Sequence, residues 1–191
     1  MTKRLNIGVD VDGVLAAFTE GARNLCKYMF NGKPDDSLIQ TGWGFDSLGL
    51  TKDEENLMWR AIDKTENWWM TLRRNPDTQL LKALTQEHRV VFITNRKDGE
   101  VGWPIEEQTQ EWLRREFGIF SPNVIISDKK GPVALGLKLN YFIDDRDKNV
   151  TEVCAEAPDC ITYLLNASYN QDCKVQRVSS FDAFANLILE N

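Results

Sequence analysis

The sequence is poor in several residue types, and each shortage excludes a class of protein. One histidine among 191 residues excludes a zinc site of the H-E-x-x-H kind, which needs two. The four cysteines form neither a C-x-x-C pair nor a zinc-ligand spacing, so we expect reduced thiols in a cytoplasm. No apolar run approaches the ~20 residues that span a bilayer. Asp10 also follows Arg4 too soon for the apolar region of a signal peptide. We therefore expect a cytoplasmic protein without membrane contact.

Positive charge is also scarce. The chain has 23 Lys and Arg against 29 Asp and Glu, a net charge of −6, and no basic run is longer than two residues. Because long nucleic acids bind basic surfaces, we expect no long nucleic-acid partner. A small phosphate-bearing metabolite needs only a few local donors and is not excluded. The sequence has no glycine-rich loop of the Walker or dinucleotide type, so ATP or NAD binding through those motifs has no support.

Short apolar runs alternate with helical patterns along most of the chain. Five runs rich in Val, Ile, Leu or Phe predict buried strands at 5–10, 89–94, 123–126, 141–144 and 160–165. Amphipathic patterns predict helices at 79–87, 104–117, 131–138 and 181–189. This alternation indicates an α/β fold, a Rossmann-like parallel sheet with helices on both faces.

One interval departs from the alternation. Residues 17–75 contain two helical patterns, 18–30 and 53–64, together with Gly/Pro breaks and a surplus of aromatic residues. We interpret this interval as a small helical cap inserted after the first strand, above the strand ends. The core would then comprise residues 1–16 and 76–191.

The strongest functional signal follows the first strand, in Asp10-Val11-Asp12-Gly13. Two carboxylates two residues apart at the end of a buried strand repel each other and lose solvation. A divalent cation such as Mg²⁺ relieves that cost, because it prefers hard oxygen ligands. Gly13 allows a sharp turn that brings backbone N–H groups toward an anion. Taken alone, the motif could equally be an Asx turn that closes a strand.

Polar residues also follow three later strands. They are Thr94-Asn95-Arg96, Lys129-Lys130 and Asp144-Asp145-Arg146. Each group alone has an ordinary explanation, such as a helix cap or a solvated charge pair. Because the carboxyl ends of parallel strands meet at one edge of a sheet, the groups together predict a single site there.

The order of these motifs resembles the haloacid dehalogenase superfamily of aspartate-nucleophile phosphohydrolases. The resemblance implies that Asp10 is the nucleophile that forms an aspartyl-phosphate and that Asp12 is the general acid/base. It also implies Mg²⁺ held by Asp10, the backbone carbonyl of Asp12, Asp144 and Asp145, which neutralises charge on the transferring phosphoryl group.

Phosphate binding in this resemblance falls to Thr94 and a lysine. Lys130 fits the K-G pattern of relatives, whereas Lys129 aligns better if Ser127-Asp128 is the anchor, so Lys129 stays an alternative to Lys130. In relatives, this threonine is often followed by serine and proline, whereas this chain has Asn95 and Arg96. Asn95 can still donate to phosphate, and Arg96 either contacts the phosphate or sugar or lies on the rim.

Within that superfamily, the segments DVDGVLAAF, Trp68-Trp69 and FIDDR look like the 5′(3′)-deoxyribonucleotidase family, whose members dephosphorylate nucleoside monophosphates. This closer resemblance implies that the base and sugar contact Phe18, Trp68, Trp69 and Arg146. We interpret Trp43 and Trp59 instead as part of the cap's own hydrophobic core.

The sequence thus predicts a Mg²⁺-dependent phosphomonoesterase that acts on deoxyribonucleoside monophosphates, through an aspartyl-phosphate. One alternative keeps the chemistry and changes the substrate to another small phosphate ester or a nucleic-acid 3′-phosphate. A non-enzyme alternative is a phosphate-binding interaction protein on the same fold. A homodimer is a further option, because the aromatic surplus of the cap could serve an interface as well as a substrate.

Overall fold

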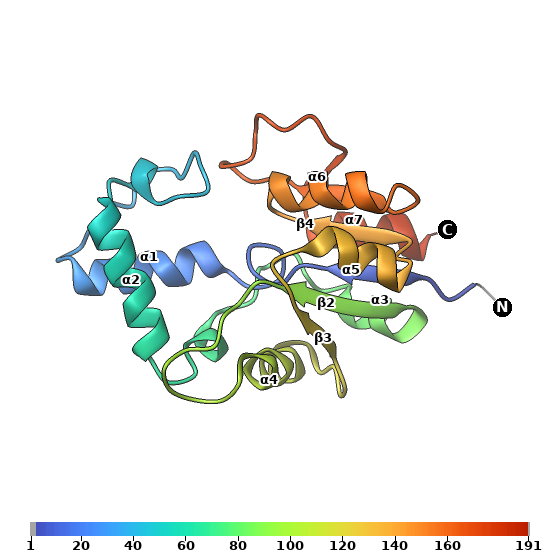
Figure 1. Cartoon of the computed structure of the whole chain (residues 1–191), viewed down its shortest axis with the longest axis horizontal. Coiled ribbons are helices and arrows are strands. Elements are labelled where there is room, and N and C mark those ends of the chain that lie inside the picture. Colours follow the sequence, from blue (N-terminus) through green and yellow to red (C-terminus); the bar gives the residue numbers. More distant parts are fainter. Residues whose placement is uncertain (1–2, 191) are drawn as a thin grey trace.

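The computed structural model describes residues 3–190 and has a central sheet of six strands (Figure 1). The strand order is β3-β2-β1-β4-β5-β6, and every neighbouring pair is parallel. The strands are β1 (Asn6–Val9), β2 (Arg89–Thr94), β3 (Asn123–Ile126), β4 (Tyr141–Asp144), β5 (Ile161–Leu165) and β6 (Arg177–Val178). Because β1 lies between β2 and β4, the chain reverses its direction of winding at β1, where ligands bind in open parallel sheets.

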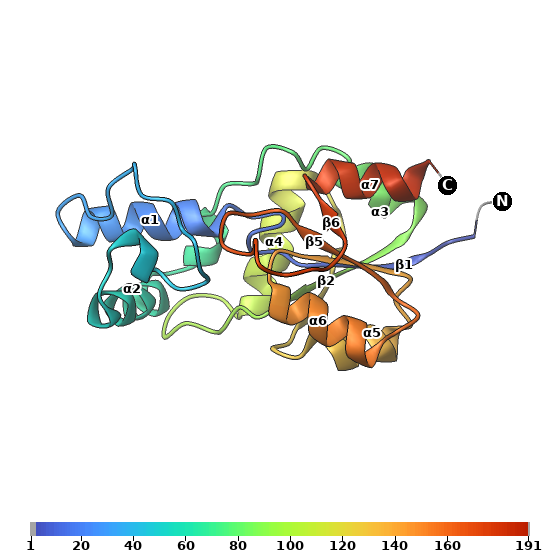
Figure 2. The same ribbon diagram turned by 90° about the horizontal axis from the view of Figure 1, so that it is seen from above.

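Seven α-helices and two short 3₁₀ helices are present in the described part of the chain. They are α1 (Phe18–Met29), η1 (Asp46–Leu48), α2 (Lys52–Lys64), η2 (Trp68–Thr71), α3 (Leu81–Glu87), α4 (Ile105–Phe117), α5 (Lys130–Leu137), α6 (Asp147–Glu156) and α7 (Phe181–Leu189). Figure 2 shows α3 and α7 on one side of the sheet and α5 and α6 on the other. None of the helices within residues 3–190 has the length and apolar character that crossing a membrane demands.

The alternation of side chains along the strands explains why both faces are covered. In β2, Val90 and Phe92 belong to the core shared with α3, α4 and α7, whereas Val91 and Ile93 belong to the core shared with α5 and α6. Successive side chains of a strand point to opposite faces, so an unbroken apolar run needs cover on both. The predicted α/β fold, a parallel sheet with helices on both faces, is confirmed.

The segment between β1 and α3 leaves the sheet and returns to it at one place. The Ala17 N–H donates to the Arg73 carbonyl at 2.8 Å, and the Asn75 N–H donates to the Leu15 carbonyl at 2.7 Å. Ala16 and Arg74 also form an antiparallel bridge. Figure 1 shows α1 and α2 beyond the carboxyl ends of the strands, at the end of the molecule opposite both termini. The inserted segment is therefore tied to the end of β1.

Candidate active site

The carboxyl ends of three adjacent strands meet at the centre of the sheet. Asp10 directly follows β1, and its N–H donates to the Ile143 carbonyl of β4 at 3.0 Å. Thr94 ends β2 on one side of β1, and Asp144 ends β4 on the other. All three polar side chains are buried, because the strands that carry them run through the core. The motifs that the sequence places at separate strand ends therefore share one site.

A tight turn follows Asp10 and depends on Gly13. The N–H groups of Leu15 and Ala16 both donate to the Val11 carbonyl, at 2.9 and 2.7 Å. Gly13 has φ of +90°, and a Cβ there would overlap the carboxylate of Asp145. Only glycine adopts this conformation without strain and leaves room for that carboxylate. The turn thus allows Asp145 to approach the backbone that follows the first aspartate.

Three buried carboxylates surround one buried lysine. Oxygens of Asp10, Asp144 and Asp145 lie within 4.8 Å of one another. The Lys130 Nζ contacts Asp10 and lies 2.6 Å from the Asp144 Oδ2. Asn149 of α6 donates to both oxygens of Asp144 at 3.0 Å. The ammonium and the amide fix Asp10 and Asp144, and the cluster keeps an excess of negative charge.

The protonation of this cluster shows how strongly its charges interact. Burial raises the pKa of Asp10 well above its usual range, the Lys130 charge opposes this, and the other acids add to it. Burial, followed by the charge of Asp144, raises the pKa of Asp145 to about 8. Burial alone would lower the pKa of Lys130, but Asp10 and Asp144 outweigh it and raise that pKa. Additional positive charge at the cluster would therefore favour the ionised carboxylates.

The cluster fits a divalent cation. The Oδ1 atom of Asp145 is buried and has no hydrogen-bond partner among residues 3–190, so one ligand atom is free. Three carboxylates face a single ammonium, which leaves charge for a cation to neutralise. Mg²⁺ prefers oxygen ligands of this kind. The acidic triad Asp10, Asp144 and Asp145 is therefore a candidate metal site, supported by an unpartnered ligand atom and by the charge balance.

Asp12 lies beside this cluster and is held by β2 and the loop after it. Arg96 donates to Asp12 through Nη2 to Oδ1 at 2.8 Å and through Nε to Oδ2 at 2.9 Å. The hydroxyl of Thr94 donates to Oδ2 at 3.2 Å. The Arg96 side chain is fully buried, which excludes the rim, one of the two places that the sequence left open for it. The sequence does not show this contact, because its two residues are 84 positions apart.

A cavity of about 400 Å³ opens onto these residues. This volume is within the range of small-molecule sites. Its polar lining consists of Asp10, Asp12, Asp63, Thr94, Asn95, Lys97, Lys130, Asp145, Arg146 and Asn149, and its aromatic lining of Phe18, Trp43, Trp59 and Trp69. The cavity therefore combines carboxylates and cations, most of them beside the strand ends, with aromatic rings from the inserted segment.

The aromatic rings differ in what they offer a ligand. Phe18 is buried, with near-parallel rings of Trp59 and Trp69 at centroid distances of 5.6 and 5.9 Å. Trp68 is buried edge-on against Phe18 and is not one of the described residues that line the cavity. Trp43 is 41% exposed, with the Arg146 guanidinium 3.8 Å from its ring centroid. Interpreting Trp43 as part of a cap core is therefore wrong, because its ring faces the cavity and solvent.

The structure places the two candidate lysines very differently. Lys130 is buried in the acidic cluster, whereas Lys129 is exposed at the N-terminus of α5. Asn95 is exposed and lines the cavity. Sequence reasoning missed Asn149 and Tyr169, whose hydroxyl donates to the Asp145 Oδ2 at 2.5 Å. Asn149 lies five residues after Asp144, and Tyr169 comes from the loop after β5, which has no motif to identify it.

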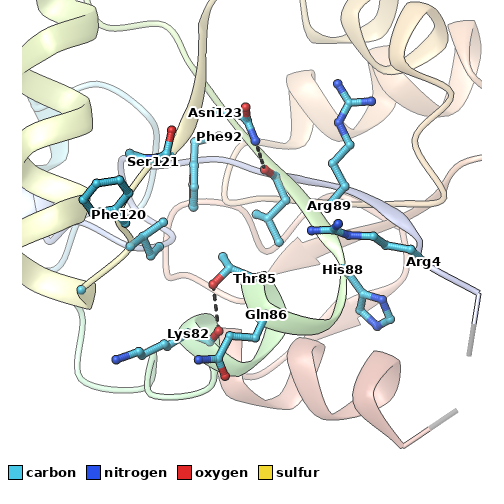
Figure 3. A pocket seen from close by; sticks show the side chains of 14 residues that line it. Arg4, Lys82, Thr85, Gln86, His88, Arg89, Phe92, Phe120, Ser121 and Asn123 are labelled. Atoms are coloured by element: carbon cyan, nitrogen blue, oxygen red, sulfur yellow. Dashed lines mark hydrogen bonds between the residues drawn. The ribbon is translucent and has the colours of Figure 1, made fainter. Parts of the chain in front are cut away.

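A second cavity, of about 290 Å³, lies at the opposite end of the sheet (Figure 3). Arg4, Lys82 and Arg89 line it, and no carboxylate is among its described lining residues. Figure 3 shows Lys82 and Gln86 from α3 on one side and Phe120 on the other. Without acidic groups this cavity has no carboxylate ligand of the kind that Mg²⁺ prefers and no carboxylate nucleophile. Of the two cavities, only the first has the carboxylates that the predicted chemistry needs.

The arrangement agrees with the comparisons to known proteins. A family model described as 5′ nucleotidase, deoxy (pyrimidine), cytosolic type C protein matches residues 3–191. The chain belongs to this family. Its members' activity and the site described above identify the chain as a phosphoric monoester hydrolase of the 5′-nucleotidase type. No curated protein matches the chain significantly.

Solved structures show the same fold at low sequence identity. A haloacid dehalogenase-like hydrolase from Streptococcus pneumoniae is 15% identical, with a TM-score of 0.63 and 100% of both chains covered. One from Burkholderia xenovorans is 13% identical, with a TM-score of 0.61 and coverage of 98% of this chain and 97% of that one. One from Bacteroides fragilis is 18% identical, with a TM-score of 0.60 and coverage of 95% and 100%. The predicted resemblance to haloacid dehalogenase-like hydrolases is confirmed.

Proposed function

We propose that this nucleotidase is Mg²⁺-dependent and releases phosphate from deoxyribonucleoside monophosphates. One observation carries the proposal: a single cavity is lined both by Asp10, Asp145 and Lys130 and by aromatic rings of the inserted segment. The charged part suits a phosphate and a metal ion, and the part lined by the rings, here called the aromatic end, suits a nucleobase. We also propose that residues 17–75 are a cap and that residues 1–16 and 76–191 are the core, although 1–2 and 191 lie outside the described residues.

The first chemical step in this proposal transfers the phosphoryl group to Asp10. A carboxylate oxygen of Asp10 attacks phosphorus, and the bond from phosphorus to the ester oxygen breaks. Asp12 gives its proton to that oxygen, so the product leaves as an alcohol. Thr94, Asn95 and Lys130 bind the phosphoryl oxygens. Mg²⁺, held by Asp10, the Asp12 carbonyl and the Asp144/Asp145 pair, would neutralise charge on the phosphoryl group.

The second step releases phosphate. Water attacks phosphorus and gives a proton to Asp12, and the bond from phosphorus to the Asp10 oxygen breaks. Asp10 is regenerated as a carboxylate, Asp12 again carries a proton, and inorganic phosphate departs. Both steps use Asp12 at one position, because the leaving oxygen and the attacking water both lie opposite Asp10 across phosphorus. Arg96 and Thr94 contact the Asp12 carboxylate. The alcohol has left by then, so water can take the position that its oxygen occupied.

Substrate recognition in the proposal rests on the aromatic end of the cavity. Trp43 offers an exposed ring there, and Arg146 lies against it. Phe18, Trp59 and Trp69 form the adjoining wall. A base stacked on an aromatic ring gains ~1–3 kcal/mol, which a sugar phosphate without a base cannot. The cytoplasmic location expected from the sequence suits such a metabolite, and the family description names cytosolic proteins.

The test is phosphate release from a panel of esters, with Mg²⁺ and with EDTA. The panel holds the deoxynucleoside 5′-monophosphates, their ribose and 3′ counterparts, sugar phosphates and a 3′-phosphorylated oligonucleotide. We expect Mg²⁺-dependent release concentrated on deoxynucleotides. Release spread over sugar phosphates, or confined to the oligonucleotide, would reject the substrate while keeping the chemistry. No release from any ester would support the non-enzyme alternative.

One pair of variants tests the nucleophile. Asp10→Asn removes the attacking carboxylate, so we expect no turnover and no trapped phosphoprotein. Asp128→Asn is the matched control, because Asp128 is exposed and lies outside the lining of the cavity. It should keep the activity of the unaltered protein. Retained activity in Asp10→Asn would reject Asp10 as nucleophile.

A further inference from the structure

Arg96 is an unusually enclosed cation. Its side chain has no exposed surface, and its Nε and Nη2 atoms donate to both oxygens of Asp12. The third nitrogen, Nη1, donates to the hydroxyl of Thr109 in α4 at 3.3 Å. Such bidentate contacts fix the orientation of a carboxylate as well as its position. Arg96 therefore determines which way the Asp12 carboxylate points.

Two tryptophans hold the guanidinium itself. Its carbon lies 5.0 Å from the Trp69 ring centroid and 5.6 Å from that of Trp112. Trp112 is fully buried in α4, and its indole N–H donates to the Leu72 carbonyl at 2.7 Å. Trp69 belongs to η2 and lines the cavity. The guanidinium thus lies over a ring of the core and a ring of the inserted segment, and burial strengthens the cation–π attraction.

The position of Arg96 argues against a direct role in binding phosphate. Arg96 is not one of the described residues that line the active-site cavity, whereas Thr94, Asn95 and Lys130 are. Its donors point to Asp12 and Thr109. An arginine with these contacts acts on the reaction through the carboxylate it holds.

We infer that Arg96 is the positioning residue of Asp12, and that Trp69 links this role to the wall of the nucleoside pocket. The inference rests on the proposed role of Asp12 as general acid/base. In this arrangement, Thr94 and Arg96 approach Asp12 from β2, and Trp69 and Trp112 prevent the guanidinium from rotating away. A ligand that contacts Trp69 therefore contacts a residue that packs against Arg96, and Arg96 holds Asp12.

The test compares Arg96→Lys and Arg96→Met with Arg74→Lys. Lysine keeps the positive charge but lacks the planar guanidinium group. Methionine keeps much of the aliphatic side chain and loses the charge. Arg74 is the matched control, because its guanidinium also lies over a ring, that of Phe117 at 5.9 Å, but is exposed and does not contact Asp12. Melting curves with and without Mg²⁺ establish that each variant is folded. If Arg96→Met fails to fold, Arg96→Lys alone decides.

Two readouts separate positioning from phosphate binding and from mere stability. General acid–base catalysis is worth about 10²–10⁴-fold, so kcat on a deoxynucleotide should fall about 10²-fold in Arg96→Met and less in Arg96→Lys. KM and inhibition by inorganic phosphate should change by no more than about twofold, because the phosphate ligands remain. With p-nitrophenyl phosphate, nitrophenolate leaves without a proton. The initial burst of nitrophenolate should therefore persist in the Arg96 variants, whereas hydrolysis of the aspartyl-phosphate should become slow.

Any of the following outcomes overturns the inference. If inorganic phosphate inhibits the Arg96 variants more weakly, by the same factor as kcat/KM falls, Arg96 is a phosphate ligand. Folded variants with unchanged kcat would leave Arg96 only a structural role. If the unaltered protein hydrolyses none of these esters, the proposed function fails and the inference fails with it. That result differs from an active protein whose Arg96 variants behave normally. Arg74→Lys should match the unaltered protein throughout.

Discussion

The ammonium of Lys130 lies 2.6 Å from Oδ2 of Asp144, and the same ammonium contacts Asp10. One cation therefore joins two carboxylates that follow neighbouring strands, and Asp145 completes the cluster. All of these groups are buried, so water screens their charges little. Substitution, pH and metal each change the charge balance of this cluster, and each change has a predictable sign.

Replacing Lys130 removes the only cation in contact with these acids in the described chain. Lys130→Met should abolish phosphate release and, in EDTA at neutral pH, reduce the free energy of unfolding by about 3–5 kcal/mol, as expected when one partner of a buried ion pair is lost. Mg²⁺ should restore part of the stability but none of the activity. Phosphate release and urea denaturation measure the two effects.

Lys129→Met provides the matched control. Lys129 is the adjacent residue of the same type and is exposed. Its substitution should change stability by less than about 0.5 kcal/mol, as is usual for surface positions, and should leave turnover intact. Loss of activity in Lys129→Met, with Lys130→Met active, would assign phosphate binding to the alternative lysine.

The raised pKa of Asp145 predicts how the stability of the metal-free protein depends on pH. The pKa of this carboxyl is about 8 in the folded protein, against an ordinary value of 3.8. Between these values the folded protein keeps a proton that the unfolded chain has lost, so the free energy of unfolding falls as pH rises. Asp10 acts in the same direction. Melting temperatures in EDTA across this range should therefore decline.

Mg²⁺ should reverse the decline, because it replaces the protons that the carboxylates would otherwise keep. The rise in melting temperature on adding Mg²⁺ should be larger at pH 8 than at pH 5. Asp145→Asn should flatten both trends. Hydrogen bonds from the Thr51 N–H and Lys33 lower the pKa of the Glu54 carboxyl to about 2. This carboxyl therefore makes the free energy of unfolding rise with pH, but only below its ordinary pKa of 4.5. A Mg²⁺ effect independent of pH would contradict the assignment.

Most of the sheet could be predicted because its strands are short apolar runs bounded by polar residues. The five predicted strands match β1 to β5 to within a residue at each end. The sequence does not reveal α6 or β6. In α6 only Val150 and Val153 supply buried apolar contacts, which is too few for a helical pattern to stand out. The strand β6 has two residues and exists only through its pairing with β5.

The site could be predicted where it depends on strand ends and not where it depends on distant contacts. Asp10, Thr94 and Asp144 are recognisable because each ends or directly follows an apolar run. The pairs Asp12–Arg96 and Asp145–Tyr169 are separated by 84 and 24 positions. They arise from the paths of loops in three dimensions, which local sequence does not encode.

Gly13 should tolerate no side chain. Gly13→Ala places a Cβ against the Asp145 carboxylate at a φ of +90°, so we expect a loss of about 1–3 kcal/mol and weaker binding of Mg²⁺. Gly136→Ala is the matched control, since open space surrounds that position in α5. It should be neutral or stabilise the helix by up to about 1 kcal/mol. Isothermal titration with Mg²⁺ and denaturation distinguish the two variants; equal behaviour would show that the turn can rearrange.

Trp43 offers the cleanest test of the proposed nucleoside pocket. Trp69 also packs on Arg96, so its substitution would disturb Asp12 as well as the pocket wall. Trp43→Ala removes an exposed ring from the cavity and should raise KM for deoxynucleotides about 5–150-fold, the equivalent of the stacking energy of one base. It should leave p-nitrophenyl phosphate nearly unchanged.

Trp103→Ala is the control for Trp43→Ala, because Trp103 is similarly exposed, at 49%, and lies outside the described lining of the cavity. It should affect neither substrate. If Trp43→Ala weakens both substrates equally, the ring supports the cavity without contacting a base. If it weakens neither, the base would have to bind along the wall of Phe18 and Trp69. Those two rings are buried and already packed near-parallel to each other, so the inserted segment would have to move to admit a base.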